Sequence, residues 1–381
     1  MIKIKILSCG DVHLTNYTAF NRPVDNSVSG SRLEYILKAL DYFFDYGNEH
    51  NIHTFVINGD LFDQRQRDNP STLEYIRYRI ISKFRTVSSD NNFLYINSGN
   101  HDQATRQVTP SAVEHFDLYR TSSHFVQVMN KVTLITDYDH EYLFIPYSED
   151  VQGLKEDIKK TLKEDKENYP IYVFAHLGVD GAVQGRWNHR LSDAFNLDDL
   201  GWNDPRVRLI TLGHFHTRQT LKKQNGKEAF YQGGLTELNF NDIRENGLGA
   251  PRGFDEIDTV TGEHKFIDLT NDPYDLPTFN LIDFDKVEDK DREHRINLLA
   301  YLSKTGNYIR ITTTDKHYYE ELKDRLVPEL TQVVFIPPEH KEEMQVKSGM
   351  SDNKIVEEYC KKYYPDVVDE ALEYLKKAKE I

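Results

Sequence analysis

The chain has 381 residues, a formal net charge of −15, 38% hydrophobic residues and 12% aromatic residues. This length and the supply of 23 tyrosines and 20 phenylalanines exclude a chain that is disordered throughout, and predict a soluble globular protein of more than one domain. No window approaches the ~20 apolar residues of a membrane span, so we expect no membrane association. Taken alone, the acidic balance argues against a nucleic-acid partner, because phosphate backbones favour basic surfaces.

Two features predict an intracellular protein. The first residues, Met1 to Leu7, alternate apolar side chains with lysine and lack the continuous apolar stretch of a signal peptide. The two cysteines, Cys9 and Cys360, lie far apart in the sequence. A disulfide framework is therefore not indicated, and a reducing compartment is the simpler interpretation.

The first half of the chain alternates strand and helix patterns, which favours an α/β layered core. The expected order is a strand at 2–7, a helix through 33–44, a strand at 54–58, a helix through 73–87 and a strand at 93–97. We then expect a meander of strands at 125–128, 132–135 and 142–145, a helix through 154–162, and strands at 171–175, 207–212, 230–231 and 254–257.

The last third of the chain has a different organisation. The segment TNDPYDLP at Thr270–Pro277 is typical of a linker. Beyond it we expect a small β-α-β unit, a loose polar segment and two amphipathic helices. Their predicted ranges are a strand at 308–312, a helix at 319–330, a strand at 332–336, the loose segment at 341–351, and helices at 352–363 and 366–379. The predicted domains are therefore 1–272, 277–338 and a helical tail at 350–381.

Five short segments rich in Asp, Asn and His each follow a predicted strand directly. They are Gly10–His13, Gly59–Asp63, Gly99–Asp102, His176 and Gly213–His216. Ligands of open α/β sheets bind outside the carboxyl ends of the strands, so we expect these loops to converge on one site. Glycines at positions 10, 59, 99 and 213 are expected to let the chain turn sharply there.

The donor atoms in these segments predict a pair of metal ions. The seven candidate ligands are Asp11, His13, Asp60, Asn100, His176, His214 and His216. Imidazole with carboxylate and amide oxygen suits manganese, iron or zinc better than magnesium or calcium alone. Seven ligands fit two ions roughly 3.5–4 Å apart that share a bridging carboxylate, for which Asp60 is the natural choice. A bridging water or hydroxide would be the nucleophile.

One histidine in these segments is not needed as a ligand. A protonated His101 would stabilise the phosphate transition state and protonate the leaving oxygen. Either Asp63 or Asp102 would hold its ring in the required tautomer. Each motif alone is a weak signal, and it is their order and their shared position after strands that indicate a site.

The ordered set D-x-H, G-D, G-N-H-D, H and G-H-x-H resembles the calcineurin-like metallophosphoesterase superfamily, and within it the SbcD-type DNA double-strand-break repair nucleases. Three features outside the ligands support that branch. They are Asn69-Pro70-Ser71 opening a helix, the glycine-rich stretch after His176, and GHFHTRQ followed by Tyr231-Gln232-Gly233-Gly234, where Gly234 replaces the usual serine. The resemblance covers residues 1–270 closely and 277–338 in architecture only.

The resemblance implies a four-layer α-β-β-α sandwich with a smaller α+β capping domain and a helical C-terminal tail. It also implies the metal sites: Asp11, His13, Asp60 and His216 for one ion, and Asp60, Asn100, His176 and His214 for the other. Two Mn²⁺ ions are expected, with Mg²⁺, Fe²⁺ or Zn²⁺ as alternatives. His101 is the implied catalytic histidine, and Asp63, where some members carry histidine, is assigned a catalytic role beside it.

The implied activity is that of a DNA exo/endonuclease acting at DNA ends in recombination and repair. The implied partners are DNA, an SMC-type ATPase such as SbcC and a second copy of the chain, in the cytoplasm or nucleoid of a cell or as a viral protein. The tail at 352–380 would dock on the ATPase or pack on the capping domain. Two bound ions would bring the site to a net charge of about +1. Basic residues near the motifs are expected to contact DNA phosphates: Arg65, Arg67, Arg106, Arg186, Arg190, Arg218, Lys222 and Lys223.

Two other functions remain open from the sequence. The first is a small-molecule phosphatase or cyclic-nucleotide phosphodiesterase on the same core, and the second is a scaffold with a degenerate site. The region after residue 277 argues against the first, because a minimal phosphatase needs neither a capping unit nor a tail. The complete ligand set argues against the second.

Overall fold

The computed structural model describes residues 4–63, 68–88, 91–103, 111–184, 189–190, 195–271, 273–337, 351–364 and 367–379. The chain forms two compact units, Met1–Phe335 and Ile336–Ile381. The predicted boundary at 272–277 falls inside the first unit, so the division of that unit into two domains stays a prediction. No described helix combines the length and the apolar character needed to cross a membrane.

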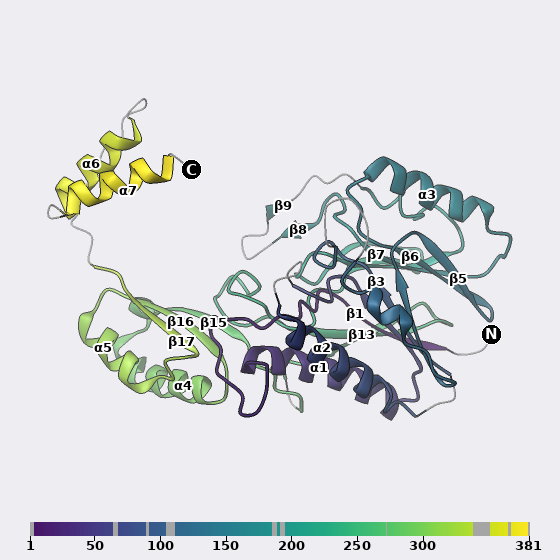
Figure 1. The fold of residues 1–381 in the computed structure, drawn as a ribbon, viewed down its shortest axis with the longest axis horizontal. Helices are drawn as coiled ribbons and strands as arrows, with labels where there is room; N and C mark the ends of the chain where they lie inside the picture. Colours follow the sequence, from purple (N-terminus) through teal and green to yellow (C-terminus); the bar gives the residue numbers. More distant parts are fainter. Residues whose placement is uncertain are drawn as a thin grey trace. The chain divides into compact units, whose positions relative to one another are not determined.

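Two six-stranded sheets form the centre of the larger unit (Figure 1). The first has the order β14-β13-β1-β2-β3-β4, with β1 (Lys5–Cys9), β2 (Thr54–Asn58), β3 (Asn92–Asn97), β4 (His124–Met129), β13 (Gly253–Asp258) and β14 (His264–Asp268). The second has the order β11-β12-β10-β7-β6-β5, with β5 (Thr133–Asp137), β6 (His140–Ile145), β7 (Ile171–His176), β10 (Val207–Gly213), β11 (Gln219–Gln224) and β12 (Lys227–Tyr231). In each sheet, parallel strands occupy the middle.

Helices cover the outer face of each sheet and complete four layers. Helices α1 (Ser31–Glu49) and α2 (Pro70–Phe84) lie on the first sheet, and α3 (Val151–Glu164) lies on the second. Helix α2 begins as the sequence predicts, with Pro70 in its first turn and the Asn69 side chain accepting a hydrogen bond from the amide of Thr72. The predicted four-layer sandwich with helical C-terminal elements is confirmed.

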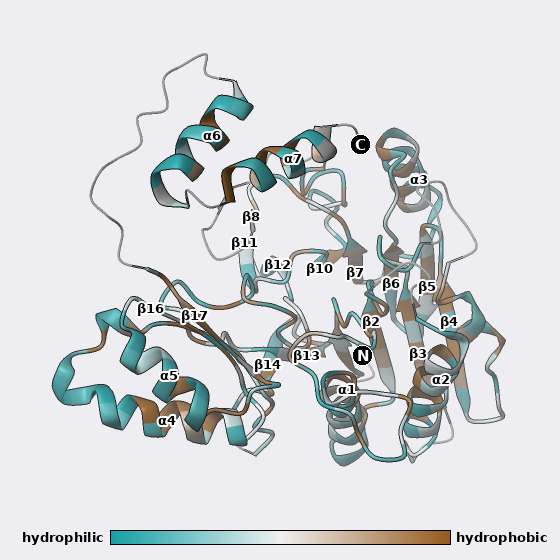
Figure 2. Cartoon of the chain, turned by 60° about the vertical axis from the view of Figure 1, so that its left-hand side comes forward, coloured by the Kyte–Doolittle hydropathy of each residue, from teal (hydrophilic) through white to brown (hydrophobic). Residues whose placement is uncertain are grey.

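Side-chain alternation along the strands explains the layering. In β2, Phe55 and Ile57 point to the core beneath α1 and α2, whereas Val56 points to the core between the sheets. That middle core is rich in aromatic side chains, including Tyr142 and Phe174 of the second sheet. Figure 2 shows the apolar residues along these central strands. Both faces of each sheet are therefore buried, as in parallel sheets generally.

The predicted meander is wrong. Strand β4 pairs in parallel with β3 of the first sheet, whereas β5 and β6 pair with each other in the second. The chain crosses between sheets at residues 130–132, so strands that follow closely in sequence belong to different layers. The sequence pattern also missed β11 and β14, both of which are edge strands.

A smaller α/β arrangement follows within the same unit. It consists of three parallel strands, β15 (Phe279–Asp283), β16 (Tyr308–Thr313) and β17 (Thr331–Phe335), with helices α4 (Arg292–Lys304) and α5 (Lys316–Arg325). Its own core includes Ile296, Ile309 and Leu322. The sequence prediction missed β15 and α4, and placed the end of α5 five residues too late. We call residues 279–335 the appended unit.

The remaining described elements are short or belong to the smaller unit. The short ones are β8 (Val183–Gln184), β9 (His189–Arg190) and three 3₁₀ turns at Glu114–Leu118, Phe284–Lys286 and Asp289–Asp291. The smaller unit contains helices α6 (Asp352–Tyr363) and α7 (Val368–Lys379), which contact each other. Ser351 caps α6 by accepting a hydrogen bond from the amide of Lys354.

Candidate metal centre

The carboxyl ends of β1, β2, β3, β7 and β10 bring the predicted ligands together. Four of these ligands have a left-handed backbone, with φ of 48° at Asp11, 53° at His13, 50° at Asp60 and 99° at His214. Non-glycine residues rarely adopt this conformation, and such residues cluster at functional sites. The ligands themselves make the sharp turns at the strand ends.

The glycines act mainly by giving room, which corrects the expectation that they make the turns. Of the four motif glycines, Gly59 alone has a positive φ, at 87°. A Cβ atom at Gly99 would lie 2.1 Å from Oδ1 of Asp60, and one at Gly213 would lie 2.8 Å from Nδ1 of His176. Glycine is required there because the ends of neighbouring strands, β2 beside β3 and β7 beside β10, approach so closely at the site.

Two buried asparagines join the sheets directly beneath the site. The Asn58 side chain donates to the carbonyl oxygens of Ala175 and Thr211 in the second sheet, at 3.2 and 3.1 Å. The Asn97 side chain donates to Oδ1 of Asn58 at 3.1 Å and to the carbonyl of Ile145 at 3.0 Å. The sequence analysis missed both residues, although each is the polar last residue of a strand and directly follows a run of apolar residues. That position is the signal that could have found them.

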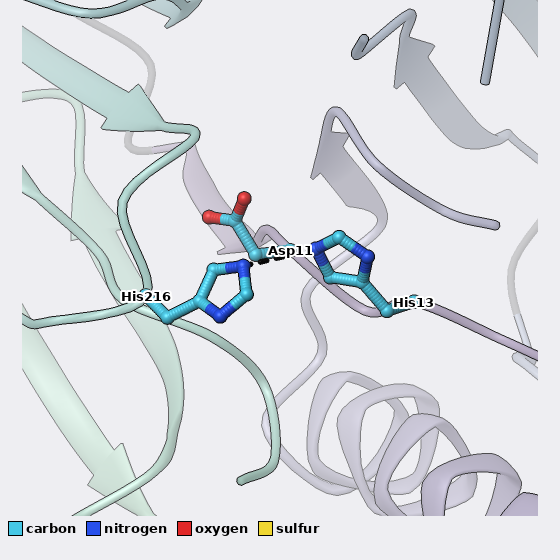
Figure 3. Close-up of side chains that lie close together, drawn as sticks. All are labelled: Asp11, His13 and His216. Atoms are coloured by element: carbon cyan, nitrogen blue, oxygen red, sulfur yellow. Dashed lines mark hydrogen bonds between the residues drawn. The ribbon is translucent and has the colours of Figure 1, made fainter. Parts of the chain in front are cut away.

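The first donor cluster contains Asp11, His13 and His216, whose potential ligand atoms all lie within 4.8 Å of one another (Figure 3). The Nε2 atoms of His13 and His216 face each other at 3.1 Å. The backbone amide of His214 donates to both carboxylate oxygens of Asp11, at 2.9 and 3.1 Å, and so fixes that side chain. Two imidazole nitrogens and a carboxylate converge here, which fits a divalent ion.

The outer nitrogen of each imidazole in this cluster faces a carboxylate. Nδ1 of His13 lies 3.1 Å from Oδ1 of Asp63, and Nδ1 of His216 lies 3.2 Å from Oδ1 of Asp242. Because each carboxylate accepts a hydrogen bond from Nδ1–H, the imidazole proton stays on Nδ1 and the lone pair of Nε2 is available to a metal. The sequence analysis missed Asp242, because 26 residues separate it from His216 and no motif marks it.

The second donor cluster contains Asp60, His176 and His214, again within 4.8 Å. Oδ1 of Asn100 completes it, at 2.9 Å from Nδ1 of His214 and 3.3 Å from Nε2 of His176. His176 donates its other nitrogen to the carbonyl of Asn58 at 2.9 Å, which orients the ring. All seven predicted ligands are therefore brought together, in the two groups that the resemblance implies.

Asp60 lies between the two clusters. Its Oδ2 atom is 3.3 Å from Nε2 of His176 in one cluster and 3.6 Å from Nε2 of His13 in the other. Burial alone would raise the pKa of this carboxyl, but the neighbouring His176 and His13 hold it well below its usual range. The Asp60 carboxylate is therefore held in its ionised form at the point where a shared ligand would stand.

His101 lies at the rim of the site with 41% of its side chain exposed. Its Nδ1 atom donates to the backbone carbonyl of Asp63, and its ring meets that of His13 edge-on, with the centroids 4.8 Å apart. His13, Asp63 and His101 also form a third cluster of potential donors. In that cluster both histidines use Nδ1 for hydrogen bonds to Asp63, so the contacts serve to orient the rings.

The other carboxylate proposed to hold His101 has a different role. Asp102 is fully buried and accepts hydrogen bonds from the amides of Leu61, Phe62 and Gly99. It therefore ties the loop after β2 to the loop after β3. The expectation that Asp102 sets the tautomer of His101 is wrong, and it is the backbone carbonyl of Asp63 that contacts His101.

The candidate DNA-contacting residues divide into two groups. Arg65, Arg67, Arg106 and Arg186 lie outside the described residues, as does the side chain of Arg190. Arg218 forms a bidentate ion pair with the fully buried Asp255, so the role of Arg218 is structural. Lys223 pairs with Glu228, and Lys222 lies over the ring of Trp202.

Comparison with known proteins finds a family match over the part of the chain that carries the candidate ligands. Residues 4–218 match the family described as calcineurin-like phosphoesterase, a range that includes all seven ligands and His101. No curated protein matches the chain. Among solved structures, a dimetal phosphatase from Danio rerio is similar at 10% identity and a TM-score of 0.38, with 66% of this chain and 91% of that chain covered.

Proposed function

The chain belongs to the calcineurin-like phosphoesterase family, and from that premise we propose that it is a two-metal DNA nuclease acting on phosphodiester bonds at DNA ends. Family membership makes the chain a metal-dependent phosphoester hydrolase whose site takes two divalent ions. The observation that carries the proposal is the position of the Asp60 carboxylate between two donor clusters.

The donors fit two ions that share one carboxylate. Asp11, His13 and His216 would hold one ion, Asn100, His176 and His214 the other, and Asp60 both. When bound, the ions supply Lewis-acid stabilisation of the phosphate and activate a water molecule for attack. We assign these ions as Mn²⁺, in line with the mixed nitrogen and oxygen donors.

His101 is the proposed general acid. Nδ1 of His101 donates a hydrogen bond to the carbonyl oxygen of Asp63. In the imidazolium form, Nε2 therefore carries the proton that is available for the leaving oxygen. The position at the rim leaves His101 accessible to a substrate too large to be enclosed. Asp63 contributes by holding His101 through its backbone and His13 through its side chain.

The choice of DNA over a small phosphoester is supported by three things. The first is the resemblance to SbcD-type nucleases over residues 1–270. The second is the exposure of His101, because small-molecule sites usually enclose their ligand. The third is the appended unit, which packs on the segment that follows the H-x-H motif: Phe279 lies 4.9 Å from Phe240, ring to ring.

The proposed assembly is a homodimer with an SMC-type ATPase partner. The unit of α6 and α7 exposes large apolar side chains, with Tyr359, Tyr364, Val367 and Tyr374 between 42% and 67% exposed. Exposed apolar groups on paired helices favour docking on another helix or coiled coil. Deletion of residues 352–381 is expected to weaken ATPase binding and to leave Mn²⁺-dependent hydrolysis intact.

The test compares two substrates. Purified protein with Mn²⁺, with and without the candidate ATPase, is given linear duplex DNA and a generic aryl phosphate in parallel. We expect DNA cleavage that EDTA abolishes and little aryl phosphate hydrolysis. Rapid aryl phosphate hydrolysis with intact DNA would favour the second candidate, a small-molecule phosphatase or cyclic-nucleotide phosphodiesterase.

A further inference from the structure

The two histidines of the first donor cluster differ from His176 of the second in the group that contacts their outer nitrogen. In the cluster of Asp11, His13 and His216, both imidazoles have a carboxylate on Nδ1: Asp63 behind His13 and Asp242 behind His216, at 3.1 and 3.2 Å. In the other cluster, Nδ1 of His176 is bonded to a neutral carbonyl, that of Asn58. A carboxylate partner makes an imidazole a stronger donor to a metal than a neutral partner does.

Asp242 is built into this position by the surrounding chain. Its Oδ1 atom faces His216, while its Oδ2 atom accepts hydrogen bonds from the amides of Leu238 and Asn239, at 2.9 and 3.2 Å. The buried Arg252 donates to the backbone carbonyls of both His216 and Asp242. The carboxylate and the ligand it supports are therefore held together at both side chain and backbone.

We propose that Asp242 and Asp63 are positioning residues that make the position at Asp11, His13 and His216 the tighter of the two metal positions. This inference rests on the proposed two-metal function. The ion at that position would load first and stay bound, while the ion held by Asn100, His176 and His214 would exchange more readily. Neither carboxylate need touch the metal, since each acts through the histidine it orients.

The segment that carries Asp242 also connects the metal position to the appended unit. Glu237, at the start of the segment, accepts a hydrogen bond from the amide of Phe279 in β15 at 2.6 Å. The carbonyl of Gly247 accepts one from the amide of Leu281 in the same strand at 2.7 Å. The appended unit therefore supports the tighter metal position through residues 237–252.

The substitution Asp242→Asn tests the role of the carboxylate sharply. The two amides that face Oδ2 require an acceptor, so the oxygen of asparagine would turn toward them and its NH₂ group toward His216. Nδ1 of His216 would then have to accept, which places the imidazole proton on Nε2, the nitrogen that faces the metal position. The volume of the side chain hardly changes, so the tautomer is the main variable.

The experiment is a Mn²⁺ titration of the metal-free full-length protein, followed by calorimetry and by the electron paramagnetic resonance signal of free Mn²⁺. We expect two ions with different affinities in the wild type. Asp242→Asn is expected to weaken the tighter one by about 10–100-fold and to leave the weaker one within about twofold. The matched control is Asp139→Asn, which changes a carboxylate 3.1 Å from Nδ1 of His140, a histidine outside both clusters, and should change neither affinity.

Several results would overturn the inference. They are two equal affinities in the wild type, unchanged affinities in Asp242→Asn, or a loss confined to the weaker ion. If Asp242→Asn fails to fold, Asp63→Asn reports on the same ion through His13, and an unchanged tighter affinity there would be equally decisive. A wild type that binds fewer than two ions would instead contradict the proposed function, and the inference would fall with it.

Discussion

Aspartates follow parallel strands both in the appended unit and at the metal end of the sandwich, by which we mean the strand ends that carry the seven candidate ligands. Their roles in the two regions differ. In the appended unit, Asp285 follows β15 and accepts hydrogen bonds from Thr313 and Thr314, while Asp315 follows β16 and caps α5. At the metal end, Asp11 and Asp60 follow β1 and β2 with a left-handed backbone and point to donors from other strands.

The difference lies in how many sheets meet. The appended unit has one sheet, so an aspartate at a strand end finds its partners in the neighbouring turn or helix. At the metal end two sheets pack face to face and are joined at the carboxyl ends of their strands through Asn58 and Asn97, so the loops of one sheet face those of the other. Carboxylates and imidazoles from both sheets then have one another as nearest partners, and that concentration of donors is what a metal requires.

Removing the shared ligand should have the largest effect. Asp60→Asn takes away the anion between the clusters, and we expect loss of at least one ion and a fall in hydrolysis well beyond the roughly 10–100-fold that outer partners give. Metal analysis and rates on linear DNA measure both. Asp285→Asn is the matched change in the appended unit, and an equal loss of metal there would break the comparison.

The next largest effect is expected at His101. His101→Ala should lower hydrolysis by about 10²–10⁴-fold, because a general acid is removed, while both ions stay bound. Metal stoichiometry with single-turnover rates separates the two properties. Loss of an ion in this variant would show that His101 is a ligand. The third donor cluster, His13, Asp63 and His101, would then itself be a metal position.

Glu237, which links the two regions, should make stability depend on pH. Burial raises the pKa of this carboxyl from its ordinary 4.5 to about 7 in the folded protein, against the opposing charge of Arg252. The folded state thus binds the proton more tightly than the unfolded state. The stabilisation is complete below pH 4.5 and is lost as the pH rises through about 7, by roughly 3 kcal/mol in all.

Urea unfolding between about pH 4 and 8 measures this loss. The expected control is Glu237→Gln, which cannot ionise and should show a flatter dependence on pH over the same range. Equal slopes in the two proteins would mean that Glu237 is ionised throughout and that another group couples stability to pH.

Gly99→Ala should show how tightly the loops after β2 and β3 approach each other at the site. The added Cβ would lie 2.1 Å from Oδ1 of Asp60, so overpacking should cost about 1–3 kcal/mol and disturb metal binding. Gly226→Ala is the control: it has a φ of 76° and no atom within 4 Å of the added Cβ. It should lower stability by about 1 kcal/mol without changing Mn²⁺ affinity. Comparable metal loss in both variants would refute the role assigned to close approach.

The layered fold and the seven clustered donors could be predicted from the sequence because both depend on local patterns, namely the periodicity of apolar residues and the short motifs that follow strands. Apolar strands such as 54–58 match β2 in the structure, and each ligand either ends such a strand, as His176 does, or follows it within a few residues. The sequence did not predict contacts between residues or strands that are joined by no local motif. Asp242 reaches His216 through a loop with no motif, and the sheet that receives β4 is decided by packing between layers.

The smallest effect is expected at the strand end of the appended unit. Asp315 accepts hydrogen bonds from the amides of His317 and Tyr318, at 2.8 and 3.4 Å, and so caps α5. Asp315→Ala should therefore cost about 1 kcal/mol in the free energy of unfolding. Mn²⁺ affinity and hydrolysis should stay at the wild-type level, because no donor of the metal end contacts this cap. A change in Mn²⁺ affinity without further loss of stability would mean that the appended unit acts on the metal position through α5 as well as through residues 237–252.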